Sequence, residues 1–198
     1  MLIIKHRINS IKKLKNTNIN FGIEFDVRSH NRKIIINHEP FKKSILLNNY
    51  LKFFKHKFAV VNIKEEGIEK SVIEILNKNK IKKYFLLDVT IPQMHKMIKT
   101  KSCYNFAIRI SKYESHSRIK NFNSKIKWIW LDTFDGHLPV SIDNIKLLKK
   151  RFKICLVSPE LTSRSFNTLN NFKKSLRQNY LIFDAICTKK STSWINNK

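Results

Sequence analysis

Short apolar runs recur along this chain of 198 residues at fairly even intervals, with polar, lysine-rich segments between them. Each run is four to six residues long, which is the length of a buried β-strand. The predicted strands are residues 2–5, 22–27, 58–63, 84–88, 106–110, 128–132, 152–157 and 184–187. Strands that alternate with helices predict a parallel sheet in which the helices are the crossover connections.

Two of the intervening segments have apolar residues at helical spacing. The residues expected to face inward are Val72, Ile73, Ile75 and Leu76 in the segment 69–78, and Ile145, Leu147 and Leu148 in the segment 142–151. An additional strand, 33–37, follows the strand 22–27 closely. The polar residues between these two strands predict a short hairpin.

Eight strand–helix units predict an α/β fold, a (β/α)8 TIM barrel, although a doubly wound open sheet would show the same alternation. We expect a compact single domain over residues 1–189 and a polar C-terminal tail over 190–198. Such barrels usually have about 250 residues, so the loops must be short. The chain has only 3 glycines, which excludes the glycine-rich loops of the common nucleotide-binding motifs.

The net charge is +26, from 40 Lys and Arg against 14 Asp and Glu. This excess suggests a nucleic acid or an anionic membrane surface as a partner. The lysines are spread along the whole chain, however, and Lys, Ile and Asn are the residues that AT-rich codons favour. We therefore expect a general attraction for anions, including a peripheral attraction to anionic membranes, and no specific nucleic-acid partner.

The three cysteines, Cys103, Cys155 and Cys187, have no paired spacing, so neither a zinc site nor a disulfide framework is predicted. The first residues lack the apolar core of a signal peptide. No apolar run approaches the roughly 20 residues that span a bilayer. We expect a cytoplasmic protein, and the sequence does not predict its oligomeric state.

Ionisable residues follow the predicted strands, at the ends where parallel barrels carry their chemistry. Glu24 and Asp26 are two residues apart on one strand, so their side chains point to the same face. Paired carboxylates suit a hard divalent ion such as Mg²⁺ or Ca²⁺. Asn62 and Asp88 are candidate further ligands. The alternative is a pair of surface carboxylates, one of which forms an ion pair with a lysine.

His6 and His38 each follow an apolar strand, at the same predicted edge as the carboxylates. Imidazole can act as a general base and a general acid near neutral pH. For either histidine alone, a capped or solvated residue at a strand end is the favoured interpretation, and the presence of the carboxylates at the same edge favours the catalytic one. The remaining histidines, which we expect on the surface, are His30, His56, His95, His116 and His137.

Several strand-end residues could contact a phosphorylated substrate. Arg7 and Arg109 could bind phosphate oxygens in a bidentate manner, and Lys64 could stabilise developing phosphate charge. Asp132 and Glu160 could contact the alcohol part of the substrate. Strand-end capping or loop ion pairs are the alternative roles for Asp88, Asp132 and Glu160.

The order of these residues resembles that of a known superfamily. His6-Arg7 resembles the start of a His-Arg-Gly motif, and residues 22–27 resemble a Gly-x-Glu-x-Asp-Val strand. Residues 34–40 resemble an apolar strand that ends in His-Asp-Pro, and residues 61–64 stand where a Glu-x-Lys pair is found. These are motifs of the glycerophosphodiester phosphodiesterase and phosphatidylinositol-phospholipase-C-like superfamily, and they cover the first third of the chain.

The resemblance implies a barrel with one divalent metal ion, Mg²⁺ or Ca²⁺, held by Glu24 and Asp26. It also implies His6 and His38 as the acid and base, and Arg7 and Lys64 as phosphate ligands. The substrate would be a glycerophosphodiester or a related small or lipid-derived phosphodiester. The chain departs from the motifs at three positions, which are Ile8 for glycine, Glu39 for aspartate and Asn62 for a carboxylate.

The sequence thus predicts a metal-dependent phosphodiesterase. One alternative is a barrel without catalysis that binds a phosphorylated ligand, which the amide at Asn62 favours slightly. The other is a basic nucleic-acid-binding protein. That alternative ranks last, because such proteins interleave exposed aromatic residues with Lys and Arg, whereas Phe and Trp fall mostly within the predicted strands and helices here.

Overall fold

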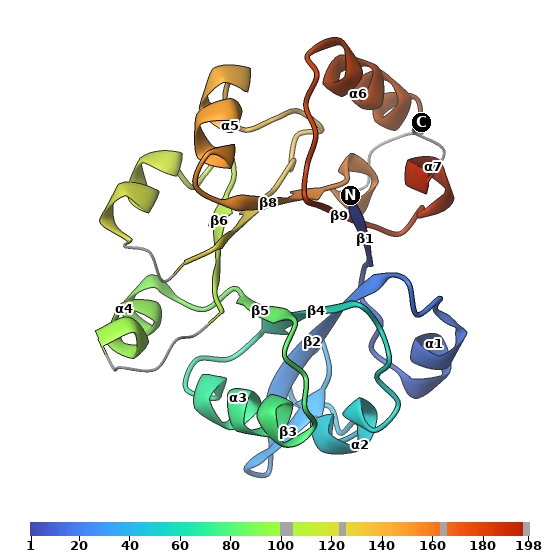
Figure 1. Cartoon of the computed structure of the whole chain (residues 1–198). Coiled ribbons are helices and arrows are strands. Elements are labelled where there is room, and N and C mark those ends of the chain that lie inside the picture. Colours follow the sequence, from blue (N-terminus) through green and yellow to red (C-terminus); the bar gives the residue numbers. More distant parts are fainter. Residues whose placement is uncertain (100–104, 123–125, 163–165, 196–198) are drawn as a thin grey trace. The chain divides into compact units, whose positions relative to one another are not determined.

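A computed structural model of the chain describes residues 1–99, 105–122, 126–162 and 166–195 (Figure 1). The chain divides into two compact units. We call Lys5–Phe106 the N-terminal unit, and Met1–Ile4 with Ala107–Lys198 the C-terminal unit. Cys103 lies outside the described residues, whereas Cys155 and Cys187 are buried.

The N-terminal unit contains a four-stranded sheet. Its strands are β2 (Gly22–His30), β3 (Lys33–Ile36), β4 (Phe58–Ile63) and β5 (Tyr84–Leu87). Strands β2, β4 and β5 are parallel neighbours in that order, and β3 pairs with β2 in the antiparallel direction. The predicted hairpin is confirmed, and Asn31 and Arg32 both have positive φ angles at its tip, as a two-residue hairpin turn requires.

The described residues of this unit include the helices α1 (Ile11–Asn16), α2 (Leu47–Leu51), α3 (Glu69–Lys78) and α4 (Ile91–Lys99). Helix α2 connects β3 to β4, and α3 connects β4 to β5. Helix α3 buries Val72, Ile73 and Leu76, as its spacing predicts. The parallel strands are apolar over almost their whole length, and all four residues of β5 are buried. Parallel strands between covering helices bury both of their faces, which explains this composition.

The C-terminal unit repeats the same alternation (Figure 1). Its strands lie in the order β1 (Leu2–Lys5), β9 (Ala185–Thr188), β8 (Lys153–Val157), β7 (Trp128–Leu131) and β6 (Ala107–Ile110). Strands β6 to β9 are parallel. The helices are α5 (Ile142–Lys149), α6 (Phe166–Gln178) and α7 (Thr192–Ile195), with two 3-10 segments, η1 (His116–Asn121) and η2 (Pro159–Thr162).

All predicted strands are present, with ends shifted by at most one residue except in β2, which continues to His30 because it pairs with β3. One helix face was predicted incorrectly. Ile145 of α5 is buried, but Leu147 is 62% exposed, because two residues of separation turn a side chain to the opposite face of a helix. Among the described residues, no helix combines the length and apolar character that crossing a bilayer requires.

Candidate active site

The carboxyl ends of β2 and β4 bring three polar side chains together. Glu24 and Asp26 lie on one face of β2 and each is only 1% exposed. The parallel register pairs Asp26 with Asn62 of β4, which is also buried. Nδ2 of Asn62 donates to Oε1 of Glu24 over 3.1 Å. The predicted convergence of these residues is therefore observed.

The segment 6–9 folds over these two carboxylates. The backbone N–H of Arg7 donates to Oε2 of Glu24 over 2.6 Å, and the N–H of Ile8 donates to the Glu24 carbonyl over 2.8 Å. Asn9 bonds to Asp26 twice, because its Nδ2 donates to Oδ2 over 2.7 Å and its Oδ1 accepts from the Asp26 N–H over 3.0 Å. Four hydrogen bonds thus fix this segment against β2.

Ile8 occupies the position where the family motif has glycine. The left-handed conformation falls one residue earlier, at Arg7, with a φ of 54°. Ile8 is buried, and Tyr50 donates its hydroxyl hydrogen to the Ile8 carbonyl over 2.5 Å. A non-glycine residue in this conformation stores strain, which surrounding contacts must offset, and such residues gather at functional sites.

Two cations and a histidine lie next to the carboxylates. Nζ of Lys64 is 3.5 Å from Oδ1 of Asp26 and 3.7 Å from Oδ2 of Asp88. Nε of Arg7 is 3.8 Å from Oδ2 of Asp26, and Nε2 of His6 is 3.8 Å from Oε2 of Glu24. Lys64 and Arg7 therefore compensate the buried negative charge.

The pKa of Glu24 is raised to about 7. Burial is the largest cause, and the neighbouring charge of Asp26 adds to it. The hydrogen bonds from Arg7 and Asn62 and the charge of Lys64 oppose the shift without cancelling it. Glu24 therefore exchanges its proton near neutral pH, which is a property of catalytic carboxyl groups.

His38 follows β3, whose end lies beside Asp26, since the Asn37 N–H donates to the Asp26 carbonyl over 3.1 Å. Nδ1 of His38 is 2.7 Å from Oε1 of Glu39. The hydrogen bond with His38 is the main cause that lowers the pKa of Glu39, and the charges of His38, Lys42 and Arg7 contribute. A carboxylate acceptor at Nδ1 fixes the tautomer of His38 and leaves Nε2 as the proton acceptor.

The side-chain oxygens at the ends of β2 and β4 supply part of the ligand set that a hard divalent ion requires. Glu24 and Asp26 offer carboxylate oxygens, and Oδ1 of Asn62 is buried without a hydrogen-bond partner in the part of the chain that the structure describes. Such an orphaned amide oxygen is suited to cation binding. Among the described residues no group of three or more His, Cys, Asp and Glu is arranged around one point. The donor set is thus two carboxylates and one amide.

The other predicted substrate residues lie in the C-terminal unit, at the ends of its strands. Arg109 of β6 donates from Nη1 to Oδ2 of Asp132 after β7, and the Trp130 indole N–H donates to the same oxygen over 3.3 Å. Glu160 accepts hydrogen bonds from the hydroxyls of Ser158 and Thr188. The predicted contacts of Arg109, Asp132 and Glu160 with a substrate stay predictions.

The sequence interpretation missed two residues at the site, Asn9 and Tyr50. Asn9 follows His6 by three residues in a strand-end segment, which is a signal that could have been used, whereas nothing around Tyr50 marks it. The expectation that His56 lies on the surface is wrong, because it is buried and its Nε2 donates to the Thr17 carbonyl over 3.1 Å. Burial lowers the pKa of His56.

Comparison with known proteins first defines the fold class. The predicted α/β fold, a (β/α)8 TIM barrel, is confirmed by the strand–helix repeat and by likeness to a solved structure. That structure is a glycerophosphoryl diester phosphodiesterase from Parabacteroides distasonis, with a TM-score of 0.70 and 10% sequence identity. The match covers 95% of this chain and 82% of that chain. The sequence itself matches no protein-family model and no curated protein sequence.

Proposed function

We propose that the chain is a phosphodiesterase that cleaves a glycerophosphodiester-like or related small or lipid-derived phosphodiester at the ends of β2, β3 and β4. The observation that carries the proposal is the cluster of His6, Glu24, Asp26 and Lys64 within ion-pair distance at these ends. The likeness of fold to a glycerophosphoryl diester phosphodiesterase supports it. In parallel α/β barrels, chemistry is located at this end of the strands.

Arg7 and Lys64 would bind the phosphate group. Both cations are held near Asp26 without a short hydrogen bond to it, at 3.8 Å and 3.5 Å. An anionic phosphate that enters the site can therefore attract them at little cost in existing contacts. Fixed cations at the position where charge develops stabilise the transition state of phosphoryl transfer.

His38 and His6 would transfer the protons. Nε2 of His38 is the acceptor, since Glu39 occupies Nδ1, so we assign His38 as the general base toward the attacking hydroxyl or water. An imidazolium at His6 would form an ion pair with Glu24, 3.8 Å away, so we assign His6 as the general acid toward the leaving alkoxide.

A divalent metal ion, Mg²⁺ or Ca²⁺, would be held by Glu24 and Asp26, with Oδ1 of Asn62 as a neutral ligand. When bound, such an ion neutralises phosphate charge and lowers the pKa of an attacking hydroxyl. The amide in place of a third carboxylate reduces the charge that the site offers, so we expect weak binding. Asp88 is the candidate further carboxylate, and Lys64 now lies beside it.

The test is hydrolysis of bis(p-nitrophenyl) phosphate and of glycerophosphodiesters with Mg²⁺, Ca²⁺ or EDTA. We expect turnover that depends on the ion and is lost when Glu24→Gln and Asp26→Asn are combined. Calorimetry with each ion should show binding to the wild type and none to the variant. Turnover that persists in EDTA would show that catalysis does not require a divalent ion. If no ion supported turnover, the proposal that the chain is an enzyme would be contradicted.

One observation favours a second candidate, a barrel that binds a phosphorylated ligand without cleaving it. Arg7 and Lys64 lie beside the two carboxylates and offset part of their charge, so the site can persist without an ion. This candidate predicts that glycerophosphodiesters bind in calorimetry and are recovered intact. Loss of that binding in Lys64→Met, with no hydrolysis by the wild type, would support it.

A further inference from the structure

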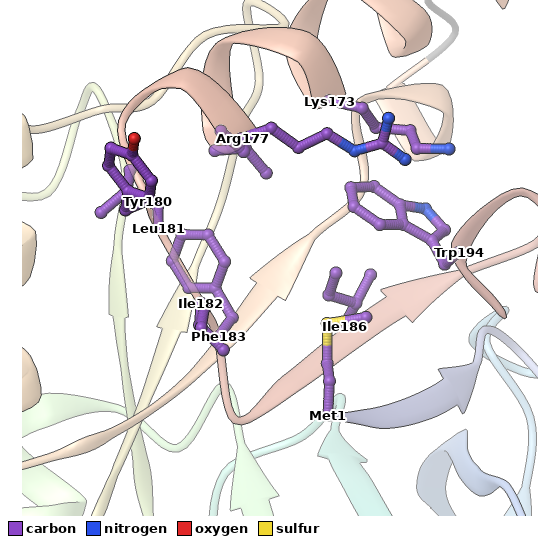
Figure 2. A pocket seen from close by; sticks show the side chains of 10 residues that line it. Met1, Lys173, Arg177, Tyr180, Leu181, Ile182, Phe183, Ile186 and Trp194 are labelled. Atoms are coloured by element: carbon purple, nitrogen blue, oxygen red, sulfur yellow. The ribbon is translucent and has the colours of Figure 1, made fainter. Parts of the chain in front are cut away.

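A cavity of about 390 Å³ opens in the C-terminal unit, and none of its lining residues belongs to the candidate active site. Helix α6, the connection to β9 and helix α7 contribute most of its lining (Figure 2). The lining residues are Met1, Lys173, Leu176, Arg177, Tyr180, Leu181, Ile182, Phe183, Ile186 and Trp194. This size lies within the range of small-molecule sites, and apolar side chains predominate, as they do in such sites.

The inner wall of the cavity is firmly held. Trp194 is 3% exposed, and its indole N–H donates to Oγ of Ser158 over 2.9 Å. Ile186 is buried on β9, and Phe183 is buried just before that strand. Figure 2 shows Ile186 and Trp194 on one side of the space and Phe183 with Tyr180 on the other. The cavity is therefore preformed at its base and needs little reorganisation to accept an apolar chain.

The mouth of the cavity exposes apolar surface. Tyr180 is 89% exposed, Ile182 is 72% exposed and Met1 is 57% exposed. Single exposed apolar residues are common, but neighbours that surround one cavity mark a ligand or interaction site. An apolar chain seated in the cavity would cover part of this surface.

Two cations complete the lining. Lys173 and Arg177 are four residues apart on α6, so they project from the same face, and like charges at this spacing repel. Burial, and then the charge of Arg177, lower the pKa of Lys173. Nζ of Lys173 lies 5.6 Å from the Trp194 ring centre, and Figure 2 shows both cationic side chains extending beside the indole. None of the described residues that line the cavity is Asp or Glu.

We propose that this cavity binds a single-chain anionic amphiphile, with its hydrocarbon chain against Ile186, Phe183 and Trp194 and its anionic group between Lys173 and Arg177. An anion placed there offsets the repulsion between the two cations, and a hydrocarbon chain matches the rest of the lining. The same chemistry is found in a free fatty acid and in a monoacyl phospholipid. The inference goes beyond the proposed phosphodiesterase activity and does not depend on it.

The experiment uses the full chain and a stearate that carries a nitroxide on its hydrocarbon chain. A nitroxide beside an indole quenches its fluorescence, and Trp194 lies in the cavity wall. We expect saturable quenching with one site per chain, lost in Trp194→Phe although calorimetry still detects binding of the acid. The methyl ester of the same acid has an identical chain without charge. It should bind about tenfold or more weaker, since hydrogen bonds to charged groups contribute that much.

Charge variants locate the anionic group. The double variant Lys173→Gln/Arg177→Gln should weaken binding of the acid by about tenfold and leave binding of the ester unchanged. Lys174→Gln is the matched control, because Lys174 is exposed on the same helix and does not line the cavity. Ile182→Asp at the exposed mouth is an independent variant and should weaken both probes. Circular dichroism checks that each variant is folded.

Competition with a monoacyl glycerophosphate of equal chain length distinguishes the two sources, since the better competitor identifies the form that the site prefers. Equal affinity for the acid and its methyl ester would overturn the proposal. The same holds if Lys174→Gln weakens binding as much as the double variant does. It also holds if only vesicles of phosphatidylcholine with phosphatidylglycerol bind, because that result indicates adsorption to a charged surface.

Discussion

The two units place polar residues at the ends of their strands in different ways. In the C-terminal unit two strand-end carboxylates have partners that match them: Asp132 accepts from Arg109 and Trp130, and Glu160 accepts from two hydroxyls. In the N-terminal unit two buried carboxylates lie on the same face of one strand, and the pKa of Glu24 rises to about 7 as a result. Buried polar groups with matched partners stabilise a fold. Carboxylates forced together are a common feature of reactive sites.

This difference distinguishes residues that stabilise the fold from residues that we expect to take part in catalysis. The Arg109–Asp132 pair joins the ends of adjacent strands β6 and β7, so it contributes to stability whether or not a substrate binds. Glu24 and Asp26 instead carry an electrostatic cost that Arg7 and Lys64 only partly offset. A site that retains such a cost is expected to use it in function.

The largest effect is expected from the histidines of the N-terminal unit. His6→Ala or His38→Ala should lower kcat by about 10²- to 10⁴-fold, the usual contribution of a general acid or base. His95→Ala is the control, because His95 is exposed on α4 of the same unit. The thermal midpoint of all three variants should stay close to that of the wild type. Full activity of both active-site variants on an identified substrate would contradict the proposed mechanism.

A matched pair of substitutions tests the comparison directly. Asp26→Asn should lower activity by about 10²-fold, because Lys64 and Arg7 lose the carboxylate that positions them. Asp132→Asn should lower the free energy of unfolding by about 2 kcal/mol, because it leaves the partly buried Arg109 with a weaker partner.

Urea titration and steady-state kinetics of both variants provide the measurements. A rise in KM for a glycerophosphodiester in Asp132→Asn would support the predicted substrate contact. If Asp132→Asn removed activity while stability did not change, the division between the two units would be wrong.

The sequence predicts the paired carboxylates of the N-terminal unit, but it does not predict the individual partners of the strand-end residues. The period of two in β2 is enough to place Glu24 and Asp26 on one face, and the apolar residues between them predict burial. The partners of Asp132 could not be predicted, because they depend on the register between β6 and β7. Asn9 bonds to Asp26 only because segment 6–9 folds back over β2, and the hydrogen bond from His56 to the Thr17 carbonyl joins residues 39 positions apart.

A moderate effect is expected in the pH dependence of stability. In EDTA, Glu24 has a pKa of about 7 in the folded chain against 4.5 for an ordinary glutamate, so the folded state holds more protons in that interval. Stability from this group is therefore complete below about pH 4.5 and is lost as the pH rises through 7, by about 3 kcal/mol. Glu24→Gln should remove this decline. Urea titrations at several pH values in the wild type and the variant measure it.

The effect of His56 on the pH dependence of stability should be opposite to that of Glu24 and smaller. Burial lowers its pKa below the usual 6.5, so the unfolded chain binds more protons than the folded chain just below that pH. Stability from His56 is therefore present above about pH 6.5 and is lost as the pH falls. His56→Gln can still donate to the Thr17 carbonyl, so it should remove this loss without removing the hydrogen bond.

Glu24 and His56 change protonation over overlapping pH ranges and with opposite effects on stability. The pH profile of wild-type stability therefore does not show either contribution separately. In the Glu24→Gln background the remaining slope below pH 6.5 should be positive, and adding His56→Gln should flatten it. This contrast separates a buried histidine that serves the fold from a buried carboxylate that serves the site, although both belong to the N-terminal unit. A slope that stays negative in Glu24→Gln would mean that the proton exchange near neutral pH belongs to another residue of the cluster.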